Sequence, residues 1–193
     1  MILPAATSAP EWFLEQMPPG YQTRVAEIDR LMSEIRAMDQ IGRVLWESGA
    51  ALAQAAREVF VALKCDAQPG AAPADMTVTI DARRRLLIHV SETDTAIQKK
   101  SAELARVFQM LHEIAEDQDR VILVANSDRL TKPVDRAEAM TADAATFLQR
   151  MGANFLSAPT LFKLWMVSQQ DPKRARTLLE RLHSQDGGIF EIS

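Results

Sequence analysis

The stretch that decides the fold runs from Ala74 to Asn126 and reads ADMTVTIDARRRLLIHVSETDTAIQKKSAELARVFQMLHEIAEDQDRVILVAN. From Met76 to Ile80, apolar residues alternate with polar ones, the period-two pattern that predicts a half-buried strand. A short turn leads to a second predicted strand over residues 86–90. Helical spacing of apolar residues follows over 96–116, and 121–125 is a continuous apolar run typical of an interior strand covered on both faces.

The flanking sequence predicts further helices and strands around this stretch. Helices are expected from Tyr21 onward and over 45–64, 136–151, 159–170 and 172–183, with Gly152 ending the third of them and Ser157 or Thr160 capping the fourth. The composition of 66–73, DAQPGAAP, predicts a loop. Short strands are expected at 154–157 and 189–192. The order predicts an α/β fold with a mixed sheet of about four strands between helices, rather than a doubly wound sheet, because the first two strands form a hairpin.

The bulk composition is that of a globular protein. The chain has 193 residues, of which 47% are hydrophobic and 25% charged, enough for one compact domain with an appendage. No apolar run approaches the roughly 18 residues of a membrane span, and the N-terminus lacks the pattern of a signal peptide. The single cysteine, Cys65, follows an apolar helix face, so we expect a buried thiol and a cytoplasmic location.

The charge balance does not indicate a nucleic-acid-binding protein. The net charge is −4, whereas duplex binding depends on clustered Lys and Arg that neutralise phosphates. Basic residues do gather in the hairpin turn at 83–85, at Lys99 and Lys100, and near 173–176. A solvated turn or helix face explains each group. The alternative, a nucleic-acid-binding module, predicts a continuous basic surface joining 83–85 to Lys99 and Lys100.

The N-terminal region, residues 1–44, is predicted to be an irregular segment followed by a helical arm, and residues 45–193 to be the α/β domain. Val25, Ile28, Met32 and Ile35 follow the 3-4-3 spacing of a coiled coil over about two heptads. This spacing fits two interpretations. The arm packs within its own chain, or it mediates self-association or docking on a protein partner.

Several segments resemble restriction-endonuclease-like proteins. Residues 46–49 (WESG), 51–55 (ALAQA) and 63–65 (LKC) are similar to an opening in which a glycine-turned helix precedes metal-binding strands. VILVANSDRLTKPVDRAEAMT (121–141) and GANFLSAPTLFKLW (152–165) are similar to the closing half of such domains. The resemblance covers about 45–165 and implies a restriction-endonuclease-like mixed sheet flanked by helices.

The resemblance also implies where a catalytic site would lie. Active members carry the PD-(D/E)XK signature, in which carboxylates hold Mg²⁺ and a lysine stabilises developing charge. Carried onto this chain, the first acid falls on Asp75 and the triplet on His89-Val90-Ser91. Only Asp75 remains as a metal ligand, because histidine is a poor Mg²⁺ ligand and Ser91 has no charge. The resemblance therefore implies a pseudo-nuclease with no cofactor.

Two alternatives keep a catalytic role for these residues. Asp75, Glu92 and a migrated Lys99 or Lys100 would rebuild a Mg²⁺ site, although strand alternation turns Glu92 away from His89 and Ser91. His89 could also serve with Asp75 as a zinc ligand or general base, although no second ligand stands at a typical spacing. We expect an inactive nuclease-fold domain that binds or assembles in a DNA-related process. A Mg²⁺-dependent endonuclease with relocated residues is the alternative.

Overall fold

The computed structural model describes residues 11–113 and 115–192, and the chain divides into two compact units between Asp39 and Gln40. In the first unit, a 3-10 helix, η1 (Glu11–Gln16), precedes the long helix α1 (Tyr21–Gly42), whose last residues belong to the second unit. Arg30 pairs with Glu27 one turn before it and with Glu34 one turn after it. These pairs line one side of α1 and support an exposed helix.

The second unit is built on one mixed sheet of six strands in the order β1-β2-β3-β4-β5-β6. Strand β2 runs antiparallel to both of its neighbours, β1 and β3, and strands β3 to β6 are parallel to one another. The strands are β1 (Asp66–Pro69), β2 (Met76–Asp81), β3 (Arg84–Thr93), β4 (Asp119–Ser127), β5 (Asn154–Ser157) and β6 (Gly188–Ile189). The α/β fold with a mixed sheet and an N-terminal helix is confirmed, with six strands instead of about four.

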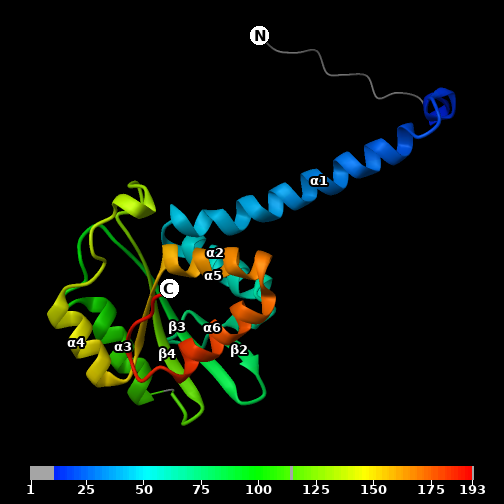
Figure 1. The fold of residues 1–193 in the computed structure, drawn as a ribbon. Helices are drawn as coiled ribbons and strands as arrows, with labels where there is room; N and C mark the ends of the chain where they lie inside the picture. The colour runs from blue at the N-terminus through cyan, green and yellow to red at the C-terminus, as the bar shows by residue number, and fades with distance from the viewer. Residues whose placement is uncertain (1–10, 114, 193) are drawn as a thin grey trace. The chain divides into compact units, whose positions relative to one another are not determined.

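Helices cover both faces of the sheet (Figure 1). One face packs against α2 (Gly49–Ala62), α5 (Ala158–Gln170) and α6 (Pro172–Ser184), and the other against α3 (Ala102–Glu113) and α4 (Ala142–Met151). Strand β4 divides its side chains between the two cores: Ile122 and Val124 lie in the first, and Leu123 and Ala125 in the second. The apolar run at 121–125 is therefore buried on both faces, as the sequence predicted.

The prediction of a loop over 66–73 is wrong in its first half, because Asp66–Pro69 forms the edge strand β1. Ala67 is buried while its neighbours are exposed, so four residues suffice to cover the edge of β2. Pro69, which has no N–H to donate, stands at the end of this edge strand, where proline is tolerated. The predicted terminal strand is shorter than expected and covers Gly188–Ile189.

Two helices begin six residues later than predicted. The segments before α3 and α4 are instead tied together: Ile97 N–H donates to Ala139 O at 2.9 Å, and Thr141 N–H donates to Ile97 O at 3.0 Å. Tertiary hydrogen bonds thus replace the local helical ones that the sequence favoured. The predicted ends are confirmed where a cap forms, since Gly152 closes α4 with φ +74° and the Ser157 hydroxyl accepts from Thr160 N–H.

The buried thiol is confirmed. Cys65 follows α2, lies in the core and forms no disulfide. Burial raises the pKa of the Cys65 thiol to about 11, and the nearby Arg176 guanidinium offsets this only in part. No helix among residues 11–113 and 115–192 is long and apolar enough to cross a membrane.

Candidate functional site

Asp75 and His89 meet at the start of β2. The antiparallel register of β2 and β3 pairs Met76 with Ile88, which places the two residues opposite each other. Asp75 Oδ2 lies 2.6 Å from His89 Nδ1 and accepts the Val90 backbone N–H at 2.8 Å. The side chain of Asp75 is 32% exposed and that of His89 is 17% exposed. The strand pairing therefore builds a part-buried carboxylate–imidazole pair at the two positions that the resemblance singled out.

The surroundings keep Asp75 ionised. Burial alone would raise the pKa of the carboxyl group, but the hydrogen bonds from His89 and Val90 and the charges of His89 and Arg106 outweigh it and hold the pKa below its ordinary value. Because an ionised carboxylate only accepts hydrogen bonds, His89 Nδ1 is the donor in this contact.

Ser91 lies on the same face of β3 as His89, two residues further on. Its hydroxyl is 3.5 Å from Glu103 Oε1 and 3.4 Å from Glu92 O, which are both long for a hydroxyl donor. Arg106 reaches this region from α3 and donates from Nε to Pro73 O at 2.7 Å. The α3 side of the β2–β3 pair therefore combines one histidine, one serine, two carboxylates and one guanidinium.

Glu92 and Lys99, the candidates for a rebuilt metal site, lie elsewhere. The Glu92 carboxylate accepts the Gly49 N–H at 2.6 Å, at the first residue of α2 on the opposite face of the sheet. A carboxylate there interacts favourably with the helix dipole. Lys99 Nζ lies 5.3 Å above the centroid of the Phe147 ring in α4. Among residues 11–113 and 115–192, no three His, Cys, Asp or Glu side chains are placed to hold a metal ion.

Two of the three hairpin arginines are engaged with acidic residues. Arg84 pairs with Asp81 and Glu180, and Arg85 binds both carboxylate oxygens of Asp119 at 2.6 and 2.8 Å. Their charges are thus offset locally. This arrangement does not favour the continuous basic surface that a nucleic-acid-binding module requires.

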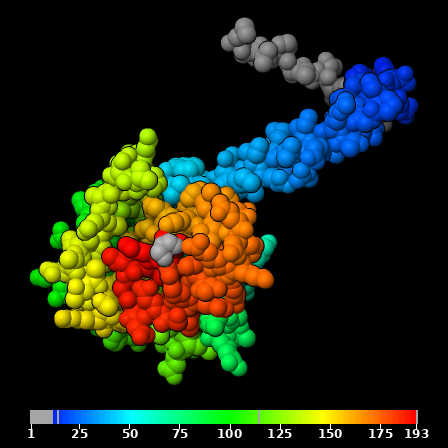
Figure 2. All heavy atoms as spheres, viewed as in Figure 1, coloured from blue at the N-terminus to red at the C-terminus, as the bar shows by residue number. Residues whose placement is uncertain are grey.

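A second cluster fixes the loop after β4. Arg136 donates to Asn126 Oδ1 at 2.8 Å and to Leu45 O at 2.6 Å, and Asn126 Nδ2 donates to Glu47 O at 3.2 Å. The loop beyond these contacts protrudes from the second unit (Figure 2, yellow-green), with Leu130 and Val134 almost fully exposed. Arg136 thus holds the base of an exposed loop against the segment that leads into α2.

Helix α1 exposes an apolar side made of several large side chains. Among the residues described, only Ile41 of α1 is buried. What we name the α1 apolar face consists of side chains that are 39–56% exposed: Val25, Ile28, Leu31, Met32, Ile35 and Met38. Such a face normally marks a site of association.

Sequence reasoning identified Asp75, His89 and Ser91, but it missed Arg106 and Glu103. Their contacts depend on how α3 packs on β3, and spacing along the chain carries no signal of that packing. Arg106 does stand next to the buried Val107, on the border of the apolar face of α3. A charged residue at the border of an apolar helix face was the one sequence feature that pointed to Arg106.

A comparison with protein-family models, with curated proteins and with solved structures finds no match to this chain.

Proposed function

We propose that this chain is a restriction-endonuclease-like domain that acts as a binding or assembly module in a DNA-related process, without metal-dependent nuclease activity. The mixed sheet between helices agrees with the fold that the resemblance implies. Asp75 and His89, the positions of the first acid and of the triplet, are in contact. The free, buried Cys65 fits a reducing compartment such as the cytoplasm.

The chemistry at Asp75 supports the absence of metal catalysis. Oδ2 already serves His89 and Val90, and the position of the second carboxylate holds an imidazole. Mg²⁺ requires hard oxygen ligands in near-octahedral geometry, and one remaining carboxylate oxygen does not supply them. Ser91 offers no positive charge to a phosphorane-like transition state.

The single observation that carries the assembly proposal is the α1 apolar face. With Val25 and Met32 at the a positions of a heptad and Ile28 and Ile35 at the d positions, the intrahelical Glu27–Arg30–Glu34 pairs fall at c and f, away from the seam. In a parallel pair of helices, Arg24 at g then faces Asp29 at e of the second copy, an attractive contact. We therefore take the partner to be a second copy of the chain.

Light scattering after size-exclusion chromatography tests the assembly proposal. The wild-type chain should elute with about twice its 21.5 kDa mass, and Ile28→Glu/Ile35→Glu should elute as a monomer, because buried carboxylates in the seam are strongly unfavourable. Ala26→Glu/Ser33→Glu is the matched control, because both residues are exposed on the opposite side of α1. A monomeric wild-type chain, or a dimer that persists in the Ile28→Glu/Ile35→Glu variant, contradicts self-association.

A plasmid-cleavage assay with Mg²⁺ and with Mn²⁺ tests the other half of the proposal. We expect no cleavage by the purified wild-type chain. Cleavage that disappears in Asp75→Ala but persists in Asp81→Ala, an acidic control in the hairpin turn, would replace the pseudo-nuclease with a working endonuclease. Replacing Glu92 or Lys99 in that case would identify the relocated residues.

A further inference from the structure

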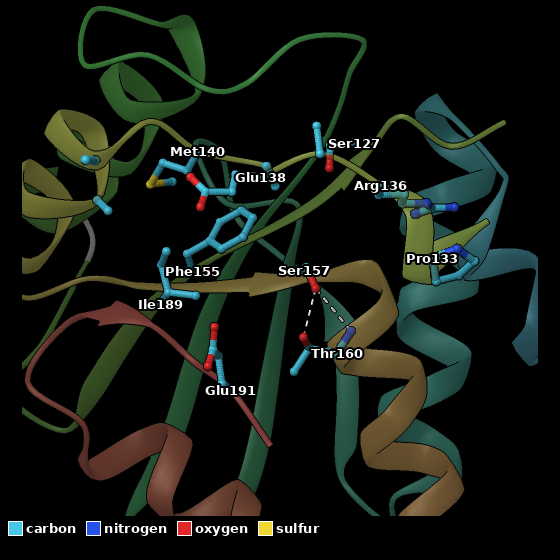
Figure 3. Close-up of a pocket in the computed structure, with 14 residues that line it drawn as sticks. Ser127, Pro133, Arg136, Glu138, Met140, Phe155, Ser157, Thr160, Ile189 and Glu191 are labelled. Atoms are coloured by element: carbon cyan, nitrogen blue, oxygen red, sulfur yellow. Dashed lines mark hydrogen bonds between the residues drawn. The ribbon is translucent and has the colours of Figure 1, made fainter. Parts of the chain in front are cut away.

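A cavity of about 310 Å³ opens at the carboxyl ends of β4 and β5, between these strands and the segment that leads into α4 (Figure 3). After β4 the chain passes to α4 on one face of the sheet, and after β5 it passes directly into α5 on the opposite face. Neighbouring parallel strands whose connections leave to opposite faces create a crevice outside their carboxyl ends. Such crevices are the usual ligand sites of open α/β sheets.

The cavity contains a hydroxyl group that is free to bind. Ser127 ends β4 on the same face as Leu123 and Ala125, lines the cavity and is only 8% exposed. None of the described residues forms a hydrogen bond with its hydroxyl group, and Ser127 Oγ is not one of the fully buried side-chain atoms that lack a partner, which among the described residues are Arg57 Nε, Ser101 Oγ and Asn154 Oδ1. The Ser127 hydroxyl group is therefore accessible from the cavity and can bind a ligand there.

The walls and rim of the cavity indicate what kind of ligand fits. Phe155, Met140 and Ile189 supply apolar surface, and Glu138 and Glu191 bring two carboxylates that pair with no Lys or Arg of the described chain (Figure 3). An aromatic ring beside carboxylates is the usual environment for an organic cation.

Two features argue against an anion. The first turn of α5 points into the crevice, but Pro159 has no N–H and the Thr160 N–H is already taken by the Ser157 hydroxyl at 3.1 Å. Arg136 also lines the cavity, yet its guanidinium is bound to Asn126 and to carbonyl oxygens and is directed away from Glu138 (Figure 3). The helix start and the arginine therefore offer few free donors to a phosphate or carboxylate.

We infer that this crevice binds a small organic cation, an ammonium or guanidinium group on an apolar stem. Glu138 and Glu191 attract the charge, Phe155 and Met140 contact the stem, and the Ser127 hydroxyl accepts an N–H from the ligand. The site is independent of Asp75 and of the α1 apolar face. If no cation binds in the crevice, the proposed function therefore still stands, and if the proposed function is wrong, the crevice can still bind a cation.

Nuclear magnetic resonance titration of the full chain with agmatine, a guanidinium on a four-carbon stem with a terminal amine, tests the inference. We expect saturable shifts of the Ser127, Met140 and Ser157 amides that weaken as salt is added. N-acetylarginine methylamide forms the second arm. If only agmatine binds, the ligand of the cavity is a small molecule with a free amine. If agmatine and N-acetylarginine methylamide both bind, an arginine side chain of a partner protein also fits the cavity.

Charge-neutralising variants test whether the Glu138 and Glu191 carboxylates bind agmatine. Glu138→Gln/Glu191→Gln keeps the shape of both side chains and should weaken agmatine binding about tenfold, as expected for two exposed charge contacts. Glu58→Gln/Glu113→Gln removes the same charge from two helices outside the cavity and should bind like the wild type. Equal affinity of the wild type and Glu138→Gln/Glu191→Gln, or shifts that map away from Ser127 and Ser157, would overturn the inference.

Discussion

Replacing Asp75 with asparagine tests whether the pair with His89 stabilises the fold. The carboxylate accepts one hydrogen bond from His89 at 2.6 Å and one from Val90 at 2.8 Å. Hydrogen bonds to a charged group contribute about 1.5–3 kcal/mol each when buried. The amide oxygen of the substituted side chain can still accept one of them as a neutral group, and the 32% exposure of Asp75 weakens the charge effect by solvent screening. We therefore expect the free energy of unfolding to fall by about 1–2 kcal/mol.

The loss of stability in Asp75→Asn should depend on pH. The folded-state pKa of Asp75 lies below its ordinary value, so its contribution is fully present above the unfolded-state pKa, which is near 4. It is lost as the pH falls through the folded-state pKa. The difference in unfolding free energy between the wild type and Asp75→Asn should therefore shrink as the pH falls below about 4.

Urea unfolding followed by circular dichroism between pH 3 and pH 7 measures both quantities. Thr79→Val, a change on the same strand that leaves no ionisable group altered, is the control for effects of substitution in β2. A difference between the wild type and Asp75→Asn that stays constant down to pH 3, or an Asp75→Asn variant as stable as the wild type, would refute the assignment of Asp75 as an ionised, stabilising partner of His89.

Three further predictions concern residues outside this pair. Cys65, with a pKa of about 11, should react with a disulfide reagent at pH 8 about 200-fold more slowly than a free thiol, from the thiolate fraction alone; rapid labelling of the folded chain would contradict its burial. Asp119→Ala should lower the free energy of unfolding by about 2–4 kcal/mol in a urea titration, because it leaves Arg85 and the Glu116 N–H without their buried acceptor; a loss similar to that of the exposed Asp117→Ala would show that the pair contributes little. Arg136→Met should speed proteolysis and hydrogen exchange within 127–139 while leaving exchange in β4 unchanged; uniform exchange changes would show that Arg136 does not act locally.

Much of the fold follows from local patterns in the sequence. The alternation at Met76–Ile80 and the apolar run at 121–125 predict β2 and β4, because strand periodicity and burial on two faces leave distinct signatures. Residues 66–69 carry no such signature. Their strand exists because the edge of β2 supplies hydrogen-bond partners, and the turn-forming composition of 66–73 concealed it.

In the candidate site, too, some positions follow from local sequence patterns and others depend on tertiary packing. Alternation along β3 correctly places Glu92 on the face opposite His89, because side-chain direction depends only on position in the strand. The positions of Arg106 and Lys99 depend on how the segment around α3 packs. Residues 96–101 favour helix locally, but Ile97 bonds with Ala139 and Thr141, and a turn closed by the Ser101 N–H on Gln98 O follows. No pattern within 96–101 reports a partner forty residues away.

The contact between Asp75 and His89 also bears on how activity could be gained. A carboxylate in place of His89 would stand within hydrogen-bonding distance of Asp75, and two like charges there must share a proton or bind a cation. His89→Asp would therefore be unstable near neutral pH until a divalent ion is added. In Ser91→Lys, the new ammonium group would lie next to the Glu103 carboxylate and would pair with it rather than with a phosphate. Building a metal-dependent site at this position would thus take at least two substitutions made together with metal present, and each single substitution would weaken the chain or form an ion pair in place of a catalyst.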